Sequence, residues 1–299
     1  MANARRLVNG TTYLVTRRVV KRQLLLTPTQ EVKQILLYCL AYAAKRYSME
    51  IHAFCFLSNH YHLVLTDPES RLPEFMHWLN KYSAKCINAL HGEWGVFWDP
   101  DGYSAVVLGD EDAVLEKIVY TICNPVQAEL VSRGEDWPGL RTGVNEVGRA
   151  EYVVERPGKF FREKGPLPQS ETLRLAPLPC RGPEASELLI EVLRERVCQS
   201  EEQIRSHVKK KRRRFLGRHK VLRQDRTSTS TSYEPRRGIK PQVASRDKWK
   251  RIELLGTVKQ FLSAYREALA RFLAGERKVV FPAGTYLIRV RFGVRCEPA

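Results

Sequence analysis

Residues 49–66, MEIHAFCFLSNHYHLVLT, contain two short runs of strand-forming residues with a turn between them. The runs, residues 49–57 and 61–66, are rich in aromatic and β-branched side chains, which favour strands. Ser58 and Asn59 separate them, and both residue types are common in tight turns. The stretch therefore predicts an antiparallel β-hairpin, which indicates a sheet that is not wholly parallel.

The sequence on both sides of the hairpin predicts further strands and helices. Residues 10–20 and 103–109 alternate between apolar and polar side chains well enough for strands. Apolar periodicity and cap residues predict three helices, over residues 27–48 (cap Thr27 or Thr29), 72–92 (ending at Gly92) and 110–124 (cap Asp110 or Asp112, stopped by Pro125). Helices between strands that pair antiparallel indicate an α+β fold, with an antiparallel sheet flanked by helices.

The chain is strongly basic. Among its 299 residues, 50 are Lys or Arg and 33 are Asp or Glu, which gives a net charge of +17. Such an excess is typical of proteins that bind a polyanion, most often nucleic acid. No apolar run reaches the roughly 18 residues of a membrane span, and MANARRLVNGTTYLV lacks the features of a signal peptide.

The cysteines indicate the redox environment. Seven of them are scattered along the chain without a CxxC pair. An odd number without paired spacing argues against a disulfide framework and against a zinc finger. We therefore expect a protein of the reducing cytoplasm with no membrane partner.

Composition divides the chain into three predicted parts. Residues 1–140 carry the strands and helices described above, and residues 141–183 are dense in Pro and Gly, which predicts an irregular linker. Residues 184–299 form a basic, mostly helical C-terminal region, for which we expect DNA binding. This last part contains, in order, a predicted helix (184–197), a basic run (205–226), a low-complexity stretch (227–238), a helix (245–276) and a strand (285–295).

Two histidines flank Tyr61 at the start of the second strand of the hairpin. Successive side chains of a strand alternate between faces, so His60 and His62 project from one face and Tyr61 from the other. Their Cα atoms lie about 7 Å apart by the strand rise. Two imidazoles so placed can hold a divalent metal ion, although a third ligand must come from elsewhere. Two polar residues on an ordinary strand are the alternative interpretation.

The third predicted helix supplies a second group of polar residues. On a helical wheel Ile118 and Ile122 lie on a core stripe, whereas Lys117 and Asn124 fall within about 60° of Tyr120. Tyr120 and Asn124 are one helical turn apart, so both side chains can address one site. An amphipathic tyrosine at the rim of a helix is the alternative interpretation.

These motifs together resemble the HUH tyrosine transposases, which act on single-stranded DNA. The resemblance rests on IHAFCF (51–56), SNHYHLVLTDP (58–68) and YTICNPVQAELV (120–131), and it covers roughly residues 8–140. The Tyr-x-x-x-Asn-Pro-Val arrangement is shared with the REP-associated tyrosine transposases, which makes them the more similar branch. The resemblance implies a ferredoxin-like HUH endonuclease core. One departure is Glu129, which stands where the family usually has glycine.

The resemblance implies a role for each matched residue. His60 and His62 correspond to the metal-binding histidines, Asn124 to a third ligand and Tyr120 to the nucleophile, and the implied metal is Mg²⁺ or Mn²⁺. The phenolate attacks a DNA phosphodiester and leaves a 5′-phosphotyrosine and a free 3′-OH, which can later rejoin a strand. Because a free tyrosine has a pKa near about 10, a proton acceptor is needed. Lys117 and a metal-bound water are the candidates.

Two basic clusters are candidate nucleic-acid contacts. The first follows the first predicted strand, where its residues either grip phosphates or form a solvated basic turn: Arg17, Arg18, Lys21 and Arg22. The second is a continuous run that would give salt-dependent affinity without sequence preference: Lys209, Lys210, Lys211, Arg212, Arg213 and Arg214.

The sequence therefore predicts a metal-dependent single-stranded DNA endonuclease and strand transferase, similar to a transposase. Its expected partner is single-stranded DNA with hairpins, and a homodimer is one possible assembly. Two alternatives stay open. The chain could be a domesticated protein that binds hairpin DNA or RNA without cleaving it, or a phosphodiesterase that uses water in place of Tyr120.

Overall fold

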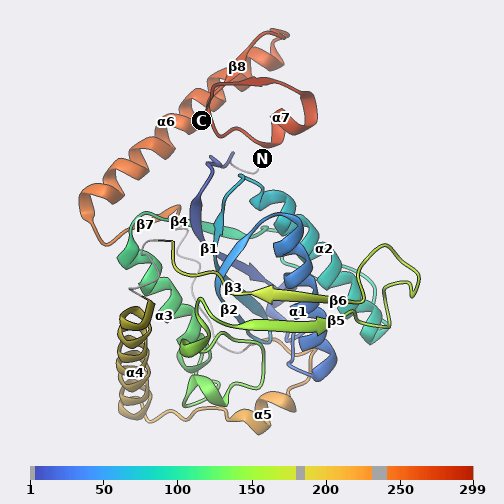
Figure 1. Ribbon diagram of the computed structural model, residues 1–299, viewed down its shortest axis with the longest axis vertical. Coiled ribbons are helices and arrows are strands. Elements are labelled where there is room, and N and C mark those ends of the chain that lie inside the picture. The colour runs from blue at the N-terminus through green and yellow to red at the C-terminus, as the bar shows by residue number, and fades with distance from the viewer. Residues whose placement is uncertain (1–3, 180–185, 231–240, 299) are drawn as a thin grey trace.

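The computed structural model describes residues 4–179, 186–230 and 241–298 (Figure 1). Its centre is a sheet in the order β2-β3-β1-β4-β7. The strands are β1 (Thr11–Arg18), β2 (Glu50–Phe56), β3 (His60–Asp67), β4 (Ser104–Leu108) and β7 (Val243–Ala244). β2, β3, β1 and β4 pair antiparallel, and β7 joins β4 in parallel. The predicted α+β class and hairpin are confirmed.

Helices cover both faces of the sheet (Figure 1). One face carries α1 (Gln30–Arg46) and α2 (Leu72–His91), and the other carries α3 (Glu111–Gln127), with α4 (Ser186–Lys210) outside it. Alternate residues of β3 divide between these layers: Leu63 packs towards α1 and α2, and Val64 packs towards α3. The side on which a β3 residue projects therefore decides which helix it meets.

Cap residues fix where the helices begin and end. The side chain of Thr29 accepts a hydrogen bond from the Val32 N–H, and that of Asp110 accepts one from the Ala113 N–H. Gly92 ends α2 with φ 66°, the left-handed conformation that glycine adopts without cost. Of the alternative caps, Thr29 and Asp110 are the ones used.

The sequence predicts that the third helix stops at Pro125, and this expectation is wrong. α3 continues to Gln127 with Pro125 inside it. A proline near the end of a helix removes a single backbone hydrogen bond, and here both Pro125 and Val126 are buried. Burial of these side chains offsets the lost hydrogen bond, and Asn124 keeps its place on the helix, one turn after Tyr120.

Residues 141–183, predicted as an irregular linker, contain a hairpin of β5 (Glu151–Glu155) and β6 (Ser170–Arg174). It packs on α1, where the Tyr38 hydroxyl donates to the Pro168 carbonyl over 2.7 Å and Lys45 pairs with Glu171 at 3.1 Å. Short 3-10 turns precede it, at Gly134–Asp136 and Val144–Glu146, and another, Val20–Arg22, follows β1. The boundaries of the three sequence parts stay a prediction.

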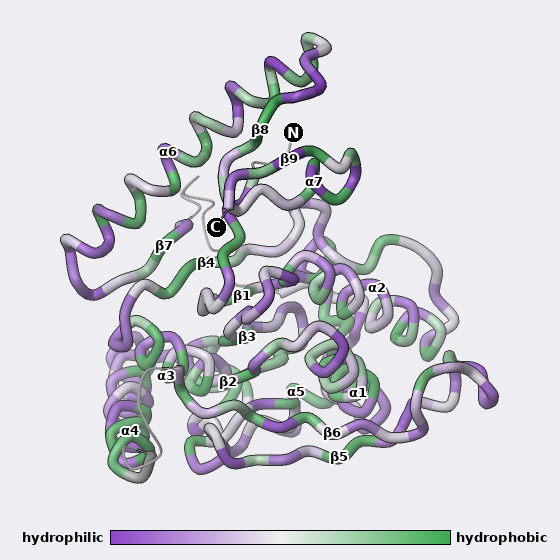
Figure 2. The backbone as a smooth tube through the Cα atoms, turned by 45° about the horizontal axis from the view of Figure 1, so that its top comes forward, coloured by the Kyte–Doolittle hydropathy of each residue, from purple (hydrophilic) through white to green (hydrophobic). Residues whose placement is uncertain are grey.

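The C-terminal region is mostly helical, as expected. After α4 it contains α5 (Arg218–Leu222), α6 (Lys248–Leu273), β8 (Val280–Phe281), α7 (Leu287–Phe292) and β9 (Arg295–Cys296). Figure 2 shows hydrophobic and hydrophilic residues interspersed along α6. Part of the low-complexity stretch 227–238 lies outside the described residues. Within the described ranges, no helix is both long and apolar enough to cross a membrane.

The strand predicted over residues 285–295 is wrong. Most of it forms α7, and Gly293 ends this helix with φ 62°. The alternating apolar residues do not face a sheet, since Ile288 is buried but Val290 and Phe292 are 60% and 66% exposed. Ile288 instead packs with Phe281 in a small cluster beside α6. A period of two was present, but in the described structure only Arg295, at the end of this stretch, pairs with a strand, where it is opposite Val280 of β8.

Candidate active site

His60 and His62 lie on the face of β3 that meets α3. In the register of the sheet, His60 is opposite Arg18 and His62 is opposite Thr16 of β1. The two imidazole rings are 4.9 Å apart between centroids and nearly perpendicular, at 87°. The strand period thus brings both rings to one place, as the sequence indicates.

Hydrogen bonds at Nδ1 orient both imidazoles. Nδ1 of His62 is 2.8 Å from Thr16 Oγ1, and Nδ1 of His60 is 2.6 Å from Asn59 Oδ1. The second nitrogen, Nε2, therefore remains for another partner on each ring. Among the described residues, Nε2 of His62 and Oδ1 of Asn124 are buried without a hydrogen-bond partner. Buried polar atoms of this kind are rare, and an absent ligand is one of their common explanations.

Both imidazoles are held in the neutral form. Burial, together with the positive charges of Arg18 and Arg22, lowers the pKa of His60 to about 4, and a hydrogen bond with Asn124 opposes this shift. Burial, followed by charge interactions with His60 and Arg18, lowers the pKa of His62 well below its ordinary value. A neutral imidazole has the free lone pair that metal binding requires.

α3 brings Tyr120 and Asn124 to the histidines. The ring of Tyr120 meets that of His62 edge to face, with 5.1 Å between centroids and an angle of 78°. Tyr120 is half-buried, whereas Asn124 is buried and interacts with His60. Ile118 is fully buried against the sheet and fixes the rotation of the helix. Residues far apart in sequence thus form one polar site.

The donor set of this site fits a divalent cation. Two imidazole nitrogens and one amide oxygen converge from β3 and α3, and two of these three atoms are buried without a partner. Within the described ranges, no group of three or more His, Cys, Asp or Glu residues is arranged so that it could hold a metal ion. An amide as the third donor explains why such a cluster is not needed, because amide oxygens bind Mg²⁺ and Mn²⁺.

Lys117, a predicted proton acceptor, is engaged in an ion pair. Its Nζ is 2.7 Å from Glu116 Oε1, and both residues line a hollow of about 410 Å³ beside β7. Arg246 lies at the same hollow, 4.0 Å from the Glu116 carboxylate. The role of Lys117 as proton acceptor stays a prediction.

The first basic cluster is divided by the sheet. The charges of Arg18 and Arg22 act on His60, so both lie on the side of the histidines. Lys21 and Arg22 have positive φ values of 50° and 57° in the turn after β1, a strained conformation often found at functional sites. Arg17 projects from the other face, with its guanidinium 5.7 Å from the Trp98 ring centre.

The second basic cluster continues into a segment that borders the site, residues 211–230, which we call the basic strap. Its Leu216 and Gly217 N–H groups donate to the carbonyls of Glu129 and Leu130 just after α3. At its other end, the Leu24 N–H donates to the carbonyl of Ser228. Figure 1 shows α5, part of the strap, crossing one end of the sheet. The strap thus joins the end of α3 to the segment after β1.

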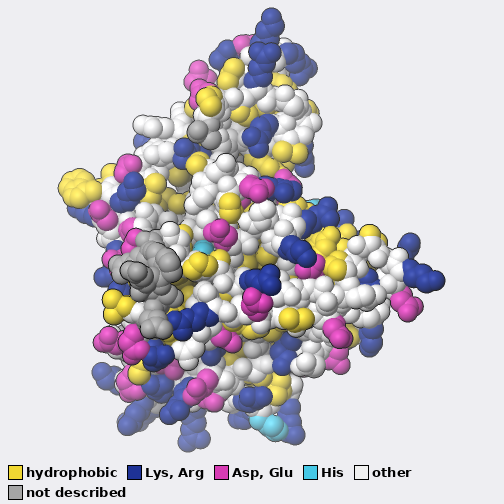
Figure 3. Space-filling model, viewed as in Figure 1, with side chains coloured by type: hydrophobic (Ala, Val, Ile, Leu, Met, Phe, Trp, Pro, Cys, Tyr) yellow, Lys and Arg dark blue, Asp and Glu magenta, His cyan; other side chains and the backbone are white. Residues whose placement is uncertain are grey.

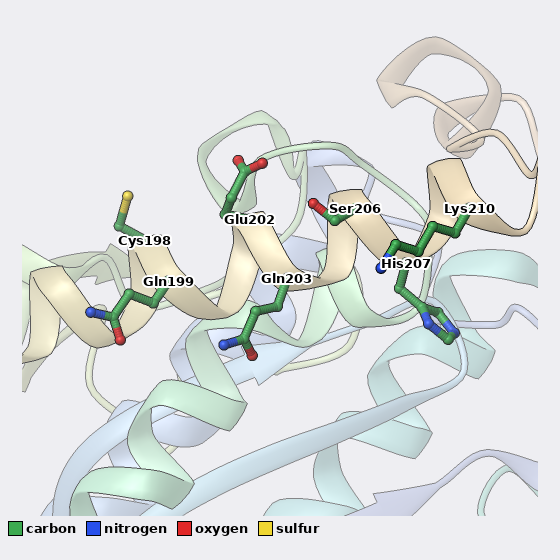
Figure 4. A pocket seen from close by; sticks show the side chains of 7 residues that line it. All are labelled: Cys198, Gln199, Glu202, Gln203, Ser206, His207 and Lys210. Carbon is green, nitrogen blue, oxygen red and sulfur yellow. The ribbon is translucent and has the colours of Figure 1, made fainter.

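Much of the cationic side-chain surface of the strap faces solvent. All four basic residues at its start are exposed: Lys211, Arg212, Arg213 and Arg214. Figure 3 shows Lys and Arg side chains along the lower edge of the molecule, where Figure 1 places α5. Lys209 is exposed and Lys210 lines a hollow along α4 (Figure 4). Every residue lining that hollow comes from one helix. The sequence identified the basic run but not its place beside the site, because only contacts between distant residues reveal it.

The conformation and the ion pair of Glu129 account for its presence where the family pattern has glycine. Its φ of 56° is left-handed, the conformation in which glycine carries no steric cost. Its carboxylate, however, pairs with Arg213 of the basic strap at 3.0 Å. Compared with glycine, glutamate at this position adopts a strained backbone conformation, but its ion pair with Arg213 holds the basic strap to the end of α3.

We expect Glu129→Gly to unfold at a higher temperature than Glu129→Gln. Both variants lose the ion pair, which contributes at most about 1 kcal/mol at a partly exposed position. The glycine variant also relieves the left-handed strain, for an expected difference of about 0.5–1 kcal/mol. Thermal unfolding of the two variants measures it. Equal stability would show that the backbone at residue 129 is not strained.

Comparison with known proteins finds a family model that matches the N-terminal part. Residues 8–122 match the family model described as Transposase IS200 like. A solved REP-associated tyrosine transposase bound to a REP hairpin is similar at 22% identity and a TM-score of 0.42, over 50% of this chain and 87% of that chain. A candidate transposase from Deinococcus radiodurans R1 has 21% identity and a TM-score of 0.30, over 39% and 93%. No curated protein matches the chain.

Proposed function

We propose that this chain, whose residues 8–122 match the IS200-like transposase family model, cleaves and transfers single-stranded DNA through Tyr120. The observation that carries the proposal is the site itself. A tyrosine ring packs on His62, while His62 Nε2 and Asn124 Oδ1 are buried beside it without a partner in the described structure. This arrangement suits a phosphodiester that enters with a bound cation.

The proposed reaction exchanges one phosphoester bond for another. The Tyr120 oxygen forms a bond to phosphorus, and the bond from phosphorus to the 3′ oxygen of the preceding nucleotide breaks. The phenol loses its proton, and the leaving 3′ oxygen gains one. The product is a 5′-phosphotyrosine and a free 3′-OH, and attack by a 3′-OH on the phosphotyrosine reverses the reaction and joins strands.

The residues around Tyr120 have distinct parts in this proposal. His60, His62 and Asn124 would hold a divalent cation, Mg²⁺ or Mn²⁺, which supplies neutralisation of charge on the phosphate oxygens when bound. Thr16 and Asn59 fix the imidazoles through their Nδ1 atoms. Among nearby cations, Arg18, Lys21 and Arg22 would attract the phosphate backbone.

The proposed substrate is a single DNA strand that contains a hairpin, in line with the resemblance to REP-associated tyrosine transposases. The six basic residues 209–214, which run from the end of α4 into the basic strap, would add contacts to the DNA backbone that weaken as salt increases. Hairpin DNA that binds tightly but forms no covalent adduct with any divalent cation would support the alternative, a binding protein without cleavage. A homodimer stays an expectation, which sedimentation of the free protein would decide.

Covalent capture tests this proposal. The protein is incubated with end-labelled single strands that contain hairpins, together with Mn²⁺, and then separated under denaturing conditions. We expect labelled DNA to migrate with the protein, because a phosphotyrosine bond survives denaturation. DNA that is cleaved with turnover but never attached would indicate attack by water.

Removal of divalent metal is expected to abolish the adduct. EDTA leaves the three ligand atoms without a cation, so the phosphate enters a site with no charge neutralisation. Addition of Mg²⁺ or Mn²⁺ in excess of the chelator should restore attachment, measured as the labelled fraction in the same gel. Full attachment in EDTA would contradict a metal-dependent mechanism.

A further inference from the structure

The face of β3 opposite the histidines forms a second candidate site. Tyr61 points away from His60 and His62, its ring lies 5.5 Å from that of Trp98, and its hydroxyl donates to Asn80 Oδ1 over 2.7 Å. Beside these residues a hollow of about 420 Å³ opens between α2 and the loop of residues 93–103. Tyr61 therefore helps to support a hollow on the non-catalytic face.

Arg17 brings to this hollow buried hydrogen-bond donors that have no partner among the described residues, and an anion would satisfy them. It is opposite Tyr61 in the sheet register and lines the hollow. Within the described structure, its Nε and Nη1 are buried without a hydrogen-bond partner, and burial lowers its pKa, although Tyr61 and Asp99 oppose this. A guanidinium presents planar pairs of donors that fit a phosphate. A phosphate in the hollow would therefore satisfy these buried donors.

The exposed side of α2 extends the positive charge beyond Arg17. His77, Lys81 and Lys85 recur every four residues and line the same hollow. From first to last they span about 12 Å along the helix, which is longer than one phosphate group. In the loop, Asp99 acts electrostatically on Arg17, and its Oδ1 accepts a hydrogen bond from the Asp101 N–H. The stripe suits a phosphate chain better than a free phosphate.

The loop beside the hollow also presents an aromatic side chain to solvent. Trp94 is 96% exposed and directly precedes Gly95, which lines the hollow. A fully exposed indole is a surface on which an unpaired base can stack. Phosphate donors, a basic stripe and an aromatic platform are the three elements that single-strand binding grooves combine.

We propose that this hollow binds a further segment of the single DNA strand, on the sheet face opposite Tyr120, with a phosphate at Arg17 and a base on Trp94. The inference rests on the proposed function for the identity of its ligand. It assigns the strand a path past α2 in addition to the basic strap. It also separates Arg17 from the other cations that follow β1.

The test measures affinity apart from cleavage, in the Tyr120→Phe background. Fluorescence anisotropy compares a short oligonucleotide, limited to the cleavage site, with one extended by single-stranded nucleotides on both sides. We expect Lys81→Glu with Lys85→Glu to weaken binding of the extended strand by about tenfold or more at low salt, and Trp94→Ala to weaken it by about tenfold. The affinity for the short strand should stay unchanged.

Matched controls keep the result specific. Arg162→Glu with Lys164→Glu, on the exposed loop between β5 and β6, changes the net charge equally and should leave affinity near wild type. Equal weakening by this control would overturn the proposal. Unchanged affinity for the extended strand in both the Lys81→Glu, Lys85→Glu variant and Trp94→Ala would also overturn it. Competition by millimolar inorganic phosphate without any preference for the extended strand would also overturn it. Adduct formation by wild type is scored separately, so failure of the proposed function is distinguishable.

Discussion

Tyr120→Phe is expected to abolish covalent attachment of DNA while leaving the fold and hairpin binding intact. The substitution removes only the attacking oxygen and keeps the ring that packs on His62. Loss of a nucleophile that no neighbour replaces should reduce adduct formation by about 10³-fold or more. The labelled fraction in a denaturing gel measures this loss, and hairpin affinity and thermal unfolding measured alongside should match wild type.

Other tyrosines supply the matched controls for this variant. Tyr82 stacks on Trp78 at 4.4 Å, on the helix layer away from the histidines, and Tyr152 lies in β5. Tyr82→Phe and Tyr152→Phe should therefore keep full attachment activity. If Tyr120→Phe forms the adduct as well as wild type does, Tyr120 is not the nucleophile. If it cleaves without attachment, water performs the attack.

His62→Ala is expected to remove both metal binding and activity. A protein that binds a cation only when folded is stabilised by it, by about 2.7 kcal/mol at a concentration one hundred times the dissociation constant. Wild type should therefore unfold at a higher temperature with Mn²⁺, whereas His62→Ala should not respond. Attachment should fall by about 100-fold or more, because phosphate charge is no longer neutralised.

A graded control comes from the residue that orients His62. Thr16→Val removes the hydroxyl at 2.8 Å from Nδ1 but keeps the imidazole. Loss of such an outer hydrogen bond typically weakens metal binding by about 10- to 100-fold. Thr16→Val should thus respond to Mn²⁺ only at higher concentration, between wild type and His62→Ala. An unchanged Mn²⁺ response in His62→Ala would place the metal elsewhere.

Local patterns predicted the site geometry because each pattern has a fixed period. The period of two in β3 puts His60 and His62 on one face whatever surrounds them. The helical period puts Asn124 one turn after Tyr120, and this survived the wrong expectation that Pro125 ends the helix. What no period could show is that α3 lies over β3 at the height of His62.

The parts that sequence missed depend on contacts between distant residues. The basic strap was visible as charge, but its hydrogen bonds to Glu129 and Leu24 join segments that no local signal connects. The strand expected near Ile288 had the right alternation, but residues 287–292 form α7 and only Arg295 pairs with β8. Arg17 seemed equivalent to its neighbours, although strand alternation alone was enough to place it on the opposite face from Arg18.

The most direct test of the account is to identify the residue that carries the DNA. After attachment in Mn²⁺, nuclease digestion leaves a nucleotide remnant on the protein, and peptide mass spectrometry locates it. We predict a 5′-phosphate linkage on the peptide that contains Tyr120, with no remnant on peptides containing Tyr82, Tyr103 or Tyr152. A remnant on any other residue, or a 3′-phosphate linkage at Tyr120, would contradict the proposed chemistry.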